Sequence, residues 1–492
     1  MDKKPAFFFV LLFLSVSSFA QNTFFKVYYS PEYNSIFSVS ETTNHDFILC
    51  GEKEVFTGGS FMNALLLKID SDGIIVHDTN LFSNELYSYF STIRSAYNSD
   101  TFFVVGKEDS TINNNSFNSI KLWRIDDNLN FLQEIEVAFV DSINNNPQGF
   151  ININDSIFFV VSITHITDSP IPDMSLLKIN LPLGSSSFFI PEQHTFRVPT
   201  GIIFDQFNSQ IKIPYYGSKD KGAVKIITHD TDMNIVSMFE PDLNYRSAAG
   251  IANFNDSSYL LNGNAMNEEE SFSLFISNFT FVNELLNQSE VKSEQDTLIY
   301  PGSGVNLLVL DSGFWAVGIY NMHPEQGGWP QEPSWIQLNR FNNSFELTEQ
   351  RYYGGDAHYV PYDMIKTSEG GIMIVGNRYD RFAVPIPFQK DPFVLKLNSE
   401  GLIVNVDNPE QPIAQEAIVL PNPGKEYLQV KLAIQHKTAR FQLFDTGGRQ
   451  VLETDLSGDM QRVKTEQLPS GVYIYRITGS NRAIGSGKWV KE

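Results

Sequence analysis

Short apolar runs separated by polar turns recur along most of this chain, with a period of about 55 residues between Asn22 and Asp407. In each copy one apolar run ends at a glycine, or once at a serine. These positions are Gly51, Gly106, Ser162, Gly217, Gly263, Gly318 and Gly376. A second apolar run follows and ends in Asp or Asn, as at Asp70, Asp126 and Asn398. A period of this length indicates stacked copies of one supersecondary unit.

Each copy has room for four short strands, which is typical of one blade of a β-propeller, and the seven copies predict a full ring. No amphipathic helical pattern longer than about two turns interrupts them. Residues 24–39 are similar to residues 349–365, which lead from the outer strand of one copy to the inner strand of the next. We therefore expect the N-terminal strand to complete the last blade, beside or instead of residues 401–406, and so to protect the edges of the ring.

The connections between strands differ on the two rims of the predicted ring. Turns rich in Asp and Asn join the first strand to the second and the third to the fourth, so they share one rim. The turn Asp70–Gly73 lacks the spaced ligands and the distal Glu of a calcium loop, and we interpret it as a hairpin turn. Long connections between second and third strands lie on the opposite rim, where binding residues commonly occur. They span residues 52–63, 107–118, 264–270, 321–334 and 377–391.

Two of these long connections, in the sixth and seventh copies, carry aromatic and cationic residues together. The candidate ligand-binding residues are His323, Trp329, Trp335, Arg378, Tyr379 and Arg381. Aromatic rings beside cations can stack on and hydrogen-bond to a sugar or a peptide. The alternative interpretation is that these side chains pack the long loops against the scaffold.

Composition narrows the range of functions. Aromatic residues make up 13% of the chain, and 40 Phe and 20 Tyr suit pleated, half-buried strands. The net charge of −22 argues against nucleic acid or an anionic membrane as partner. The single cysteine, Cys50, excludes an internal disulfide, and we interpret it as a small buried apolar residue. No known catalytic or phosphate-binding motif stands out, so the sequence predicts no cofactor and no metal site.

The first 20 residues have the pattern of a secretory signal peptide. Lys3 and Lys4 precede an apolar run over residues 7–16, and Ser18 and Ala20 form a small-x-small cleavage site. This pattern predicts export through the Sec translocon. No other apolar stretch approaches the roughly 20 residues that a transmembrane helix needs, so we expect no transmembrane segment.

A second unit follows the repeats. Residues 408–416 carry two prolines and no periodicity, and we interpret them as a linker. Residues 417–492 contain about seven short strands, among them the alternating run Tyr427–Leu432, which predicts a small immunoglobulin-like β-sandwich. Gly447 and Gly448 are expected to form a hairpin turn within it.

Three blocks of this unit carry a specific resemblance: LPNPGKEYLQVKL from Leu420, FQLFDTGGRQV from Phe441, and residues 468–492. The unit resembles the type A C-terminal sorting domain of the type IX secretion system of Bacteroidetes. The matching positions are Pro421, Asn422, Pro423, Asp445, Gly448, Arg449, Leu468, Gly471, Tyr473, Gly487, Lys488 and Lys491. The resemblance implies Sec export, passage through the type IX machinery in the outer membrane, and then removal of the domain with surface attachment or release.

The sequence therefore predicts an all-β protein: a seven-bladed β-propeller over residues 22–407, a linker over 408–416, and a sorting domain over 417–492. We expect a secreted or cell-surface protein that binds a glycan or protein ligand without catalysis. The alternative is a secreted hydrolase or lyase that degrades polysaccharide or glycan at the loop rim. A deep central pocket with two carboxylates from different blades would favour the enzyme, and a shallow aromatic rim would favour binding.

Overall fold

The computed structural model describes residues 22–492 apart from gaps at 31, 57–59, 82–86, 98, 113–114, 138–142, 167–172, 183, 191–196, 218–223, 242–244, 267–271, 294–297, 323–332, 381–388, 405–414, 434–435, 437 and 480–481. The predicted signal peptide lies outside the described residues. Within these ranges every regular element is a β-strand, and none of the chain there forms a helix long and apolar enough to cross a membrane.

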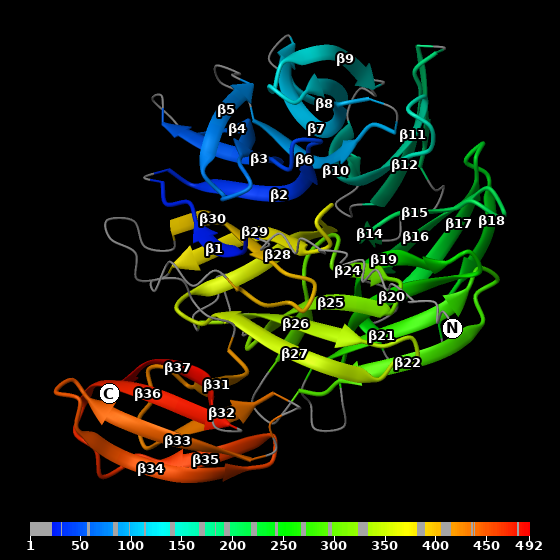
Figure 1. Cartoon of the computed structure of the whole chain (residues 1–492). Helices are drawn as coiled ribbons and strands as arrows, with labels where there is room; N and C mark the ends of the chain where they lie inside the picture. The colour runs from blue at the N-terminus through cyan, green and yellow to red at the C-terminus, as the bar shows by residue number, and fades with distance from the viewer. Residues whose placement is uncertain are drawn as a thin grey trace, which may run out of the picture.

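The first three blades are four-stranded antiparallel sheets that follow one another around the ring (Figure 1). Blade 1 consists of β2 (Asn34–Glu41), β3 (Phe47–Phe56), β4 (Ser60–Ile69) and β5 (Ile75–Leu81). Blade 2 consists of β6 (Ser88–Ser95), β7 (Thr101–Ile112), β8 (Asn115–Asp126) and β9 (Phe131–Val137). Blade 3 consists of β10 (Ile143–Asn152), β11 (Ile157–Ile166), β12 (Asp173–Asn180) and β13 (Ser185–Phe189).

The next three blades repeat this pattern, but the inner strands of blades 4 and 6 are each split in two. Blade 4 consists of β14 (Arg197–Pro199), β15 (Ile203–Asp205), β16 (Gln210–Gly217), β17 (Val224–Asp230) and β18 (Ile235–Phe239). Blade 5 consists of β19 (Tyr245–Asn255), β20 (Ser258–Met266), β21 (Phe272–Thr280) and β22 (Leu285–Val291). Blade 6 consists of β23 (Ile299–Pro301), β24 (Leu307–Leu310), β25 (Gly313–Tyr320), β26 (Trp335–Phe341) and β27 (Leu347–Gly354).

The seventh blade is built from both ends of the repeat region, as the sequence predicts. It consists of β28 (His358–Lys366), β29 (Ile372–Asp380), β30 (Gln389–Leu397) and β1 (Phe24–Val27). The N-terminal strand β1 pairs antiparallel with β30, with Phe24 opposite Lys396 and Val27 opposite Phe393. Residues 401–404 form no strand, so β1 takes the outer position of the blade. In Figure 1 the blue β1 accordingly lies beside the yellow β29 and β30.

Neighbouring blades pack through apolar side chains on both faces of their strands. In β3, Ile48 and Cys50 contribute to the core shared with blade 2, whereas Phe47 and Leu49 contribute to the core shared with blade 7. Because both faces of these strands are buried, the sequences of the second and third strands of each blade are nearly continuous apolar runs. Cys50 is fully buried and unpaired, in agreement with the interpretation from sequence, and burial raises the pKa of its thiol well above the usual value.

The recurring glycine lies where the inner strand of its blade bulges. The β2–β3 pairing shifts register directly after Ile36, which lies opposite Gly51, and the same shift follows the partners of Gly106, Gly263 and Gly376. A Cβ atom on Gly51 would lie 1.9 Å from the carbonyl oxygen of Ser35. The glycine therefore permits a close backbone approach, which is one established use of glycine in strands. In blade 4 the register places Tyr215 in this position, opposite Pro199, and not Gly217.

Hairpin turns between third and fourth strands use the side chain of a residue at the end of the third strand or directly after it, as at Asp126 and Asp70. The Asp70 carboxylate accepts hydrogen bonds from the backbone N–H groups of Asp72 (3.0 Å) and Ile74 (2.8 Å). Gly73 then adopts a φ of 72°, which glycine reaches without steric cost. The hairpin-turn interpretation of this segment is therefore confirmed.

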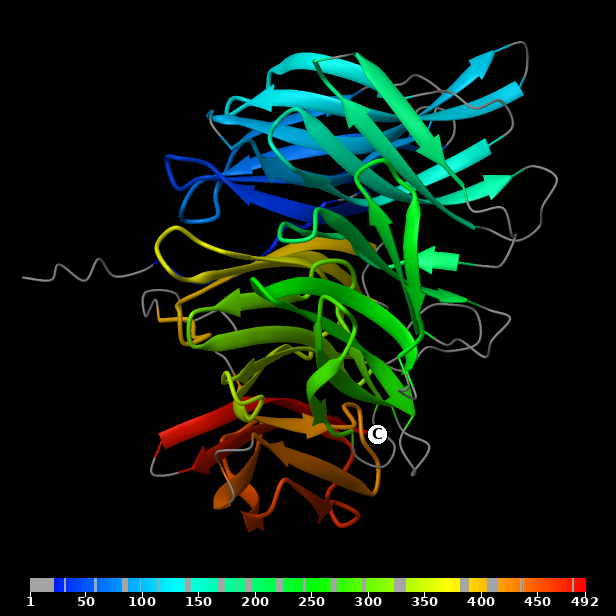
Figure 2. The ribbon, with the colours of Figure 1, turned by 90° about the vertical axis from the view of Figure 1, so that its right-hand side faces the viewer.

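The C-terminal unit is a small two-sheet sandwich. One sheet contains β31 (Ala417–Leu420), β32 (Tyr427–Leu432) and β35 (Met460–Lys464). The other contains β33 (Thr438–Asp445), β34 (Gln450–Ser457), β36 (Gly471–Gly479) and β37 (Arg482–Lys491). The sheets enclose their own apolar core around Trp489, and the unit lies at one side of the ring, below the blades in Figure 2.

Ring closure can be tested at Phe25, whose ring packs against Tyr359 and Phe393 at centroid distances of 5.6 and 5.9 Å. We expect Phe25→Ala to destabilise the propeller by about 3–5 kcal/mol, because it removes a buried aromatic ring from a closed core. Lys26→Ala, next to it and partly exposed, should change stability by no more than about 0.5 kcal/mol. Thermal unfolding of both variants checks this. Equal melting temperatures would show that β1 does not lock the ring.

The glycine position can be tested with a matched pair of substitutions. Gly51→Ala forces a Cβ atom against the Ser35 carbonyl and should cost about 1–3 kcal/mol. Gly149→Ala should be nearly neutral, since the nearest atom to its new Cβ lies at 3.9 Å. Chemical denaturation of the two variants gives the comparison, and an equally stable Gly51→Ala protein would contradict the proposed role of the glycine.

Candidate functional site

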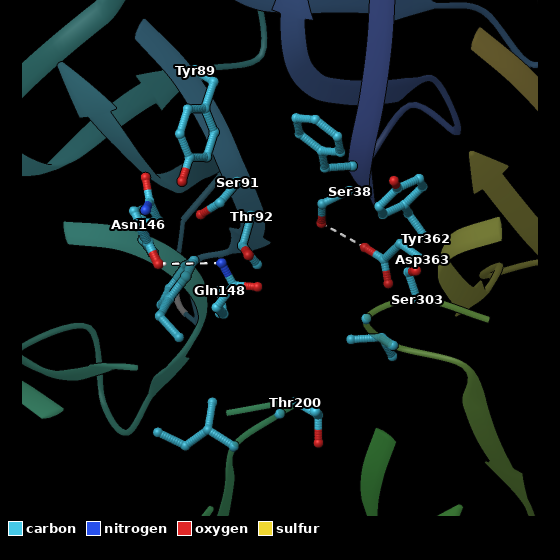
Figure 3. Close-up of a pocket in the computed structure, with 18 of the residues that line it drawn as sticks. Ser38, Tyr89, Ser91, Thr92, Asn146, Gln148, Thr200, Ser303, Tyr362 and Asp363 are labelled. Atoms are coloured by element: carbon cyan, nitrogen blue, oxygen red, sulfur yellow. Dashed lines mark hydrogen bonds between the residues drawn. The ribbon is translucent and has the colours of Figure 1, made fainter. Parts of the chain in front are cut away.

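A cavity of about 500 Å³ lies on the axis of the ring, and all seven blades contribute to its wall. The inner strands β2, β6, β10, β19 and β28 line it, together with residues 200–202 of blade 4 and 303–305 of blade 6. Figure 3 shows the side chains around this common space. A second hollow of about 690 Å³ opens toward the turn rim and shares Arg94, Phe150 and Ile202 with the first.

The bulges of the inner strands supply much of the cavity wall. In four blades the extra residue of the bulge lines the cavity: Phe37, Ser91, Gln148 and Tyr362. In blades 4 and 6 the inner strand is broken, and residues 200–202 and 303–305 at the breaks line the cavity in the same way. Bulges commonly re-aim side chains toward functional sites. These four residues are not among the candidates from the sequence, although each directly follows the residue that pairs with the repeat glycine or serine of its blade.

One buried carboxylate joins three blades at the cavity wall. Asp363 of blade 7 is 2% exposed, and its Oδ2 accepts hydrogen bonds from Ser38 Oγ (2.5 Å) and from Arg94 Nη1 (3.2 Å). The backbone N–H of Val39 also donates to Oδ2 (3.1 Å), and that of Met364 donates to Oδ1 (3.0 Å). Both carboxylate oxygens therefore have partners, and the negative charge is balanced by Arg94.

A second charge pair lies where the cavity meets the long connections. Glu52 of blade 1 accepts hydrogen bonds from Tyr87 OH (2.8 Å), Ser35 Oγ (3.1 Å) and Lys390 Nζ (3.2 Å). Burial, followed by the charge of Glu52, raises the pKa of Tyr87, and burial does the same for Tyr89. Both phenols are therefore protonated at neutral pH, and that of Tyr87 donates to Glu52.

The rest of the wall is uncharged and combines polar with apolar side chains. Hydroxyl groups of Tyr89, Ser91, Thr92, Thr200, Ser303 and Tyr362 and the amides of Asn146 and Gln148 surround the space (Figure 3). Phe37 adds an apolar surface, with its ring edge-on to Tyr362 and Tyr89 at centroid distances of 5.2 and 6.2 Å. The cavity thus offers many hydrogen bonds and several aromatic surfaces, while its charges are paired.

The structure describes three of the six predicted ligand residues. Trp335 is 4% exposed and packs in the core between blades 5 and 6, beside Tyr320. Arg378 is also buried, and its Nη2 donates to Asp356 and Asp380, both at 2.9 Å. Tyr379 is hydrogen-bonded to Tyr362, a residue of the cavity wall.

The other three predicted ligand residues, His323, Trp329 and Arg381, lie outside the described residues. Among the three described residues, Tyr379 is the one with a direct link to the cavity. A role of this set in ligand binding stays a prediction. Among the described residues, no group of three His, Cys, Asp or Glu side chains could hold a metal ion.

The predicted sorting motif ties the two ends of the C-terminal unit together. The carbonyl of Pro421 accepts a hydrogen bond from Trp489 Nε1 (2.9 Å), and Asn422 exchanges hydrogen bonds with the backbone of Lys488 and Val490. Asp445 accepts from the N–H groups of Gly447 and Arg449, each at 3.0 Å. The residues of the motif described here thus form one turn and one junction between the first and last strands of the unit.

The C-terminal unit matches a known protein family. Residues 418–492 match the family model described as the secretion system C-terminal sorting domain. This match confirms the type IX sorting domain and indicates a secreted or cell-surface protein. No curated protein sequence matches the chain.

Solved structures similar to this chain include a protein of unknown function from Dyadobacter fermentans, with 8% identity and a TM-score of 0.44 over 76% of this chain and 98% of that one. The β-propeller domain of the Trilobed protease from Pyrococcus furiosus has 8% identity and a TM-score of 0.43 over 77% and 98%. The WD40 domain of SCAP from fission yeast has 11% identity and a TM-score of 0.37 over 76% and 99%.

His358, at the start of β28, makes the stability of blade 7 depend on pH. Burial lowers its pKa to about 4, whereas an unfolded histidine titrates near 6.5. Because the folded pKa is depressed, the unfolded state gains the proton first as the pH falls. The neutral, buried His358 therefore contributes to the free energy of unfolding in full above about pH 6.5. Between about pH 6.5 and 4 this contribution is lost, which lowers the free energy of unfolding by up to roughly 3 kcal/mol.

The measurement is the unfolding free energy of the wild type and of His358→Gln at pH 7 and pH 4.5. We expect the variant to lose less stability than the wild type on acidification. His77→Gln, which changes an exposed histidine of β5, should follow the wild type. An identical pH dependence in all three proteins would contradict the role of His358.

Proposed function

We propose that this protein is an extracellular recognition propeller, exported by its sorting domain, that binds a small uncharged polyhydroxylated ligand in the central cavity. The end of a saccharide chain fits this chemistry. The observation that carries the proposal is a cavity of about 500 Å³ that is lined by all seven blades and is rich in hydroxyl, amide and aromatic groups. Small-molecule sites commonly have volumes of about 300–1,000 Å³.

The pairing of charges favours an uncharged ligand. A charged ligand leaves water at a high cost unless the site offers an opposite charge that is not already balanced. In the cavity Arg94 is paired with Asp363, and Lys390 with Glu52. Neutral hydroxyl groups of a sugar would instead exchange hydrogen bonds with Tyr89, Ser91 and Gln148, and an apolar sugar face would pack on Phe37.

A second candidate is a glycan-degrading hydrolase or lyase, and one observation favours it. Glu52 and Asp363 come from different blades and line the same cavity, as an acid and base pair would. Against this, all four carboxylate oxygens already accept hydrogen bonds, and each group has a cationic partner. A general acid would instead need an environment that keeps it protonated. We therefore place binding first.

The test is a glycan array followed by calorimetry with the best ligand, using the protein without residues 1–20. Tyr89→Phe and Gln148→Ala each remove one hydrogen-bonding group and should weaken binding about 2–10-fold. Tyr427→Phe, in the sorting domain, is the matched control and should bind like the wild type. Melting temperatures exclude unfolding as the cause.

The same experiment separates the alternatives. If Trp329→Ala and Tyr379→Ala weaken binding while the cavity variants do not, the ligand lies on the loop rim of blades 6 and 7. If the wild type releases sugars from a polysaccharide panel, and Glu52→Gln or Asp363→Asn abolishes this release, the protein is an enzyme. No glycan binding and no turnover would refute both proposals.

A further inference from the structure

The first strand of the sorting domain belongs to two apolar cores. In β31, Ala417 and Val419 face the core of the sorting domain. Ile418 and Leu420 face the other way, into the core between blades 5 and 6. The propeller residues of that core include Tyr320, Trp335 and Tyr352, all fully or almost fully buried. One strand therefore joins the two units through side chains that alternate between its faces.

A single glutamine connects the backbones of the two units. The N–H of Gln415 donates to the carbonyl of Tyr352 (2.9 Å), and the N–H of Tyr352 donates to the carbonyl of Gln415 (3.0 Å). This bridge covers part of the outer edge of β27, the last strand of blade 6. On its other side, the Gln415 side chain donates to the carbonyl of Ser486 (3.1 Å) and accepts from Tyr475 OH (3.4 Å).

One further contact crosses this junction. Lys431 Nζ of β32 lies over the ring of Tyr320, 5.9 Å from its centroid, and Lys431 is itself buried. Within the sorting domain, the buried side chains of Glu416 and His436 are hydrogen-bonded to each other directly beside the bridge. The backbone of Glu416 is also bonded within the sorting domain, to Ile484 and Ala433. The described end of the predicted linker is thus part of the docked unit.

We propose that the outer edge of blade 6 is a docking surface for the chain's own sorting domain, and that this contact holds the domain in place without a covalent connection. Cutting the chain within residues 405–414 would then leave the sorting domain bound to the propeller. The domain leaves only when Ile418, Leu420 and Gln415 are withdrawn, and its departure exposes Tyr320 and Tyr352. Removal of the domain is therefore a two-step process, cleavage followed by undocking.

The test uses the full chain with a specific protease site inserted within residues 405–414. After cleavage, the two fragments should elute together in size-exclusion chromatography at micromolar concentration. Ile418→Ser removes an apolar contact to the propeller, and Gln415→Pro removes the N–H donor of the bridge. Either substitution should make the fragments separate. Val472→Ser, which changes a 39% exposed residue of β36, is the control and should still co-elute.

The outcomes decide the proposal in either direction. Separation of the wild-type fragments, with both still folded by circular dichroism, would overturn it. Co-elution of the wild type that persists in both Ile418→Ser and Gln415→Pro would place the docking surface elsewhere. If Ile418→Ser unfolds the sorting domain, Gln415→Pro alone decides, because Gln415 lies outside the core of that domain.

Discussion

The pairing of β1 with β30 is the interaction on which the rest of the propeller depends. It joins residues more than 360 positions apart in the chain, as with Phe24 and Lys396. Phe24 packs in the core between blades 7 and 1, whereas the next residue, Phe25, packs in the core between blades 6 and 7. One short strand therefore completes two of the inter-blade cores. Without it the ring would end in an unpaired edge and open apolar surfaces.

A closed ring also determines what the central cavity can be. Each blade contributes its inner strand, and the wall is continuous only because blade 7 stands beside blade 1. The charge cluster around Asp363 depends on this arrangement, since Asp363, Ser38 and Arg94 come from blades 7, 1 and 2. Buried charges of this kind are tolerated when they are paired and hydrogen-bonded. The cluster therefore fixes three blades relative to one another at the wall of the central cavity.

The sorting domain contains the same type of Asp-stabilised hairpin turn as the propeller. Its Asp445 turn repeats the pattern of Asp70, with two backbone N–H groups bound by one carboxylate and a glycine of positive φ three residues later. Its contact with blade 6 is different in kind, because β31 places alternate side chains in two separate cores. The export signal and the exported domain are thus packed together, although their sequences show two independent patterns.

The sequence by itself determined the parts of this protein that local patterns encode. The period, the four strands of a blade, the Asp and Asn turns and the sorting motif can all be read from neighbouring residues. Ring closure was also predictable, because residues 24–39 resemble residues 349–365 and so indicate the same place in a blade. The buried state of Cys50 followed from the apolar run around it.

Tertiary structure alone decided the candidate site. Phe37, Ser91, Gln148 and Tyr362 line the cavity because their strands bulge, and a bulge exists only in the register between two strands. Arg378 is a candidate ligand-binding residue from the sequence, but the fold pairs it with Asp356, 22 positions away. Blade 4 shows the same limit, since only strand pairing places Tyr215 rather than Gly217 in the repeat position. Local patterns specify which elements form, whereas contacts between distant residues specify which side chains meet.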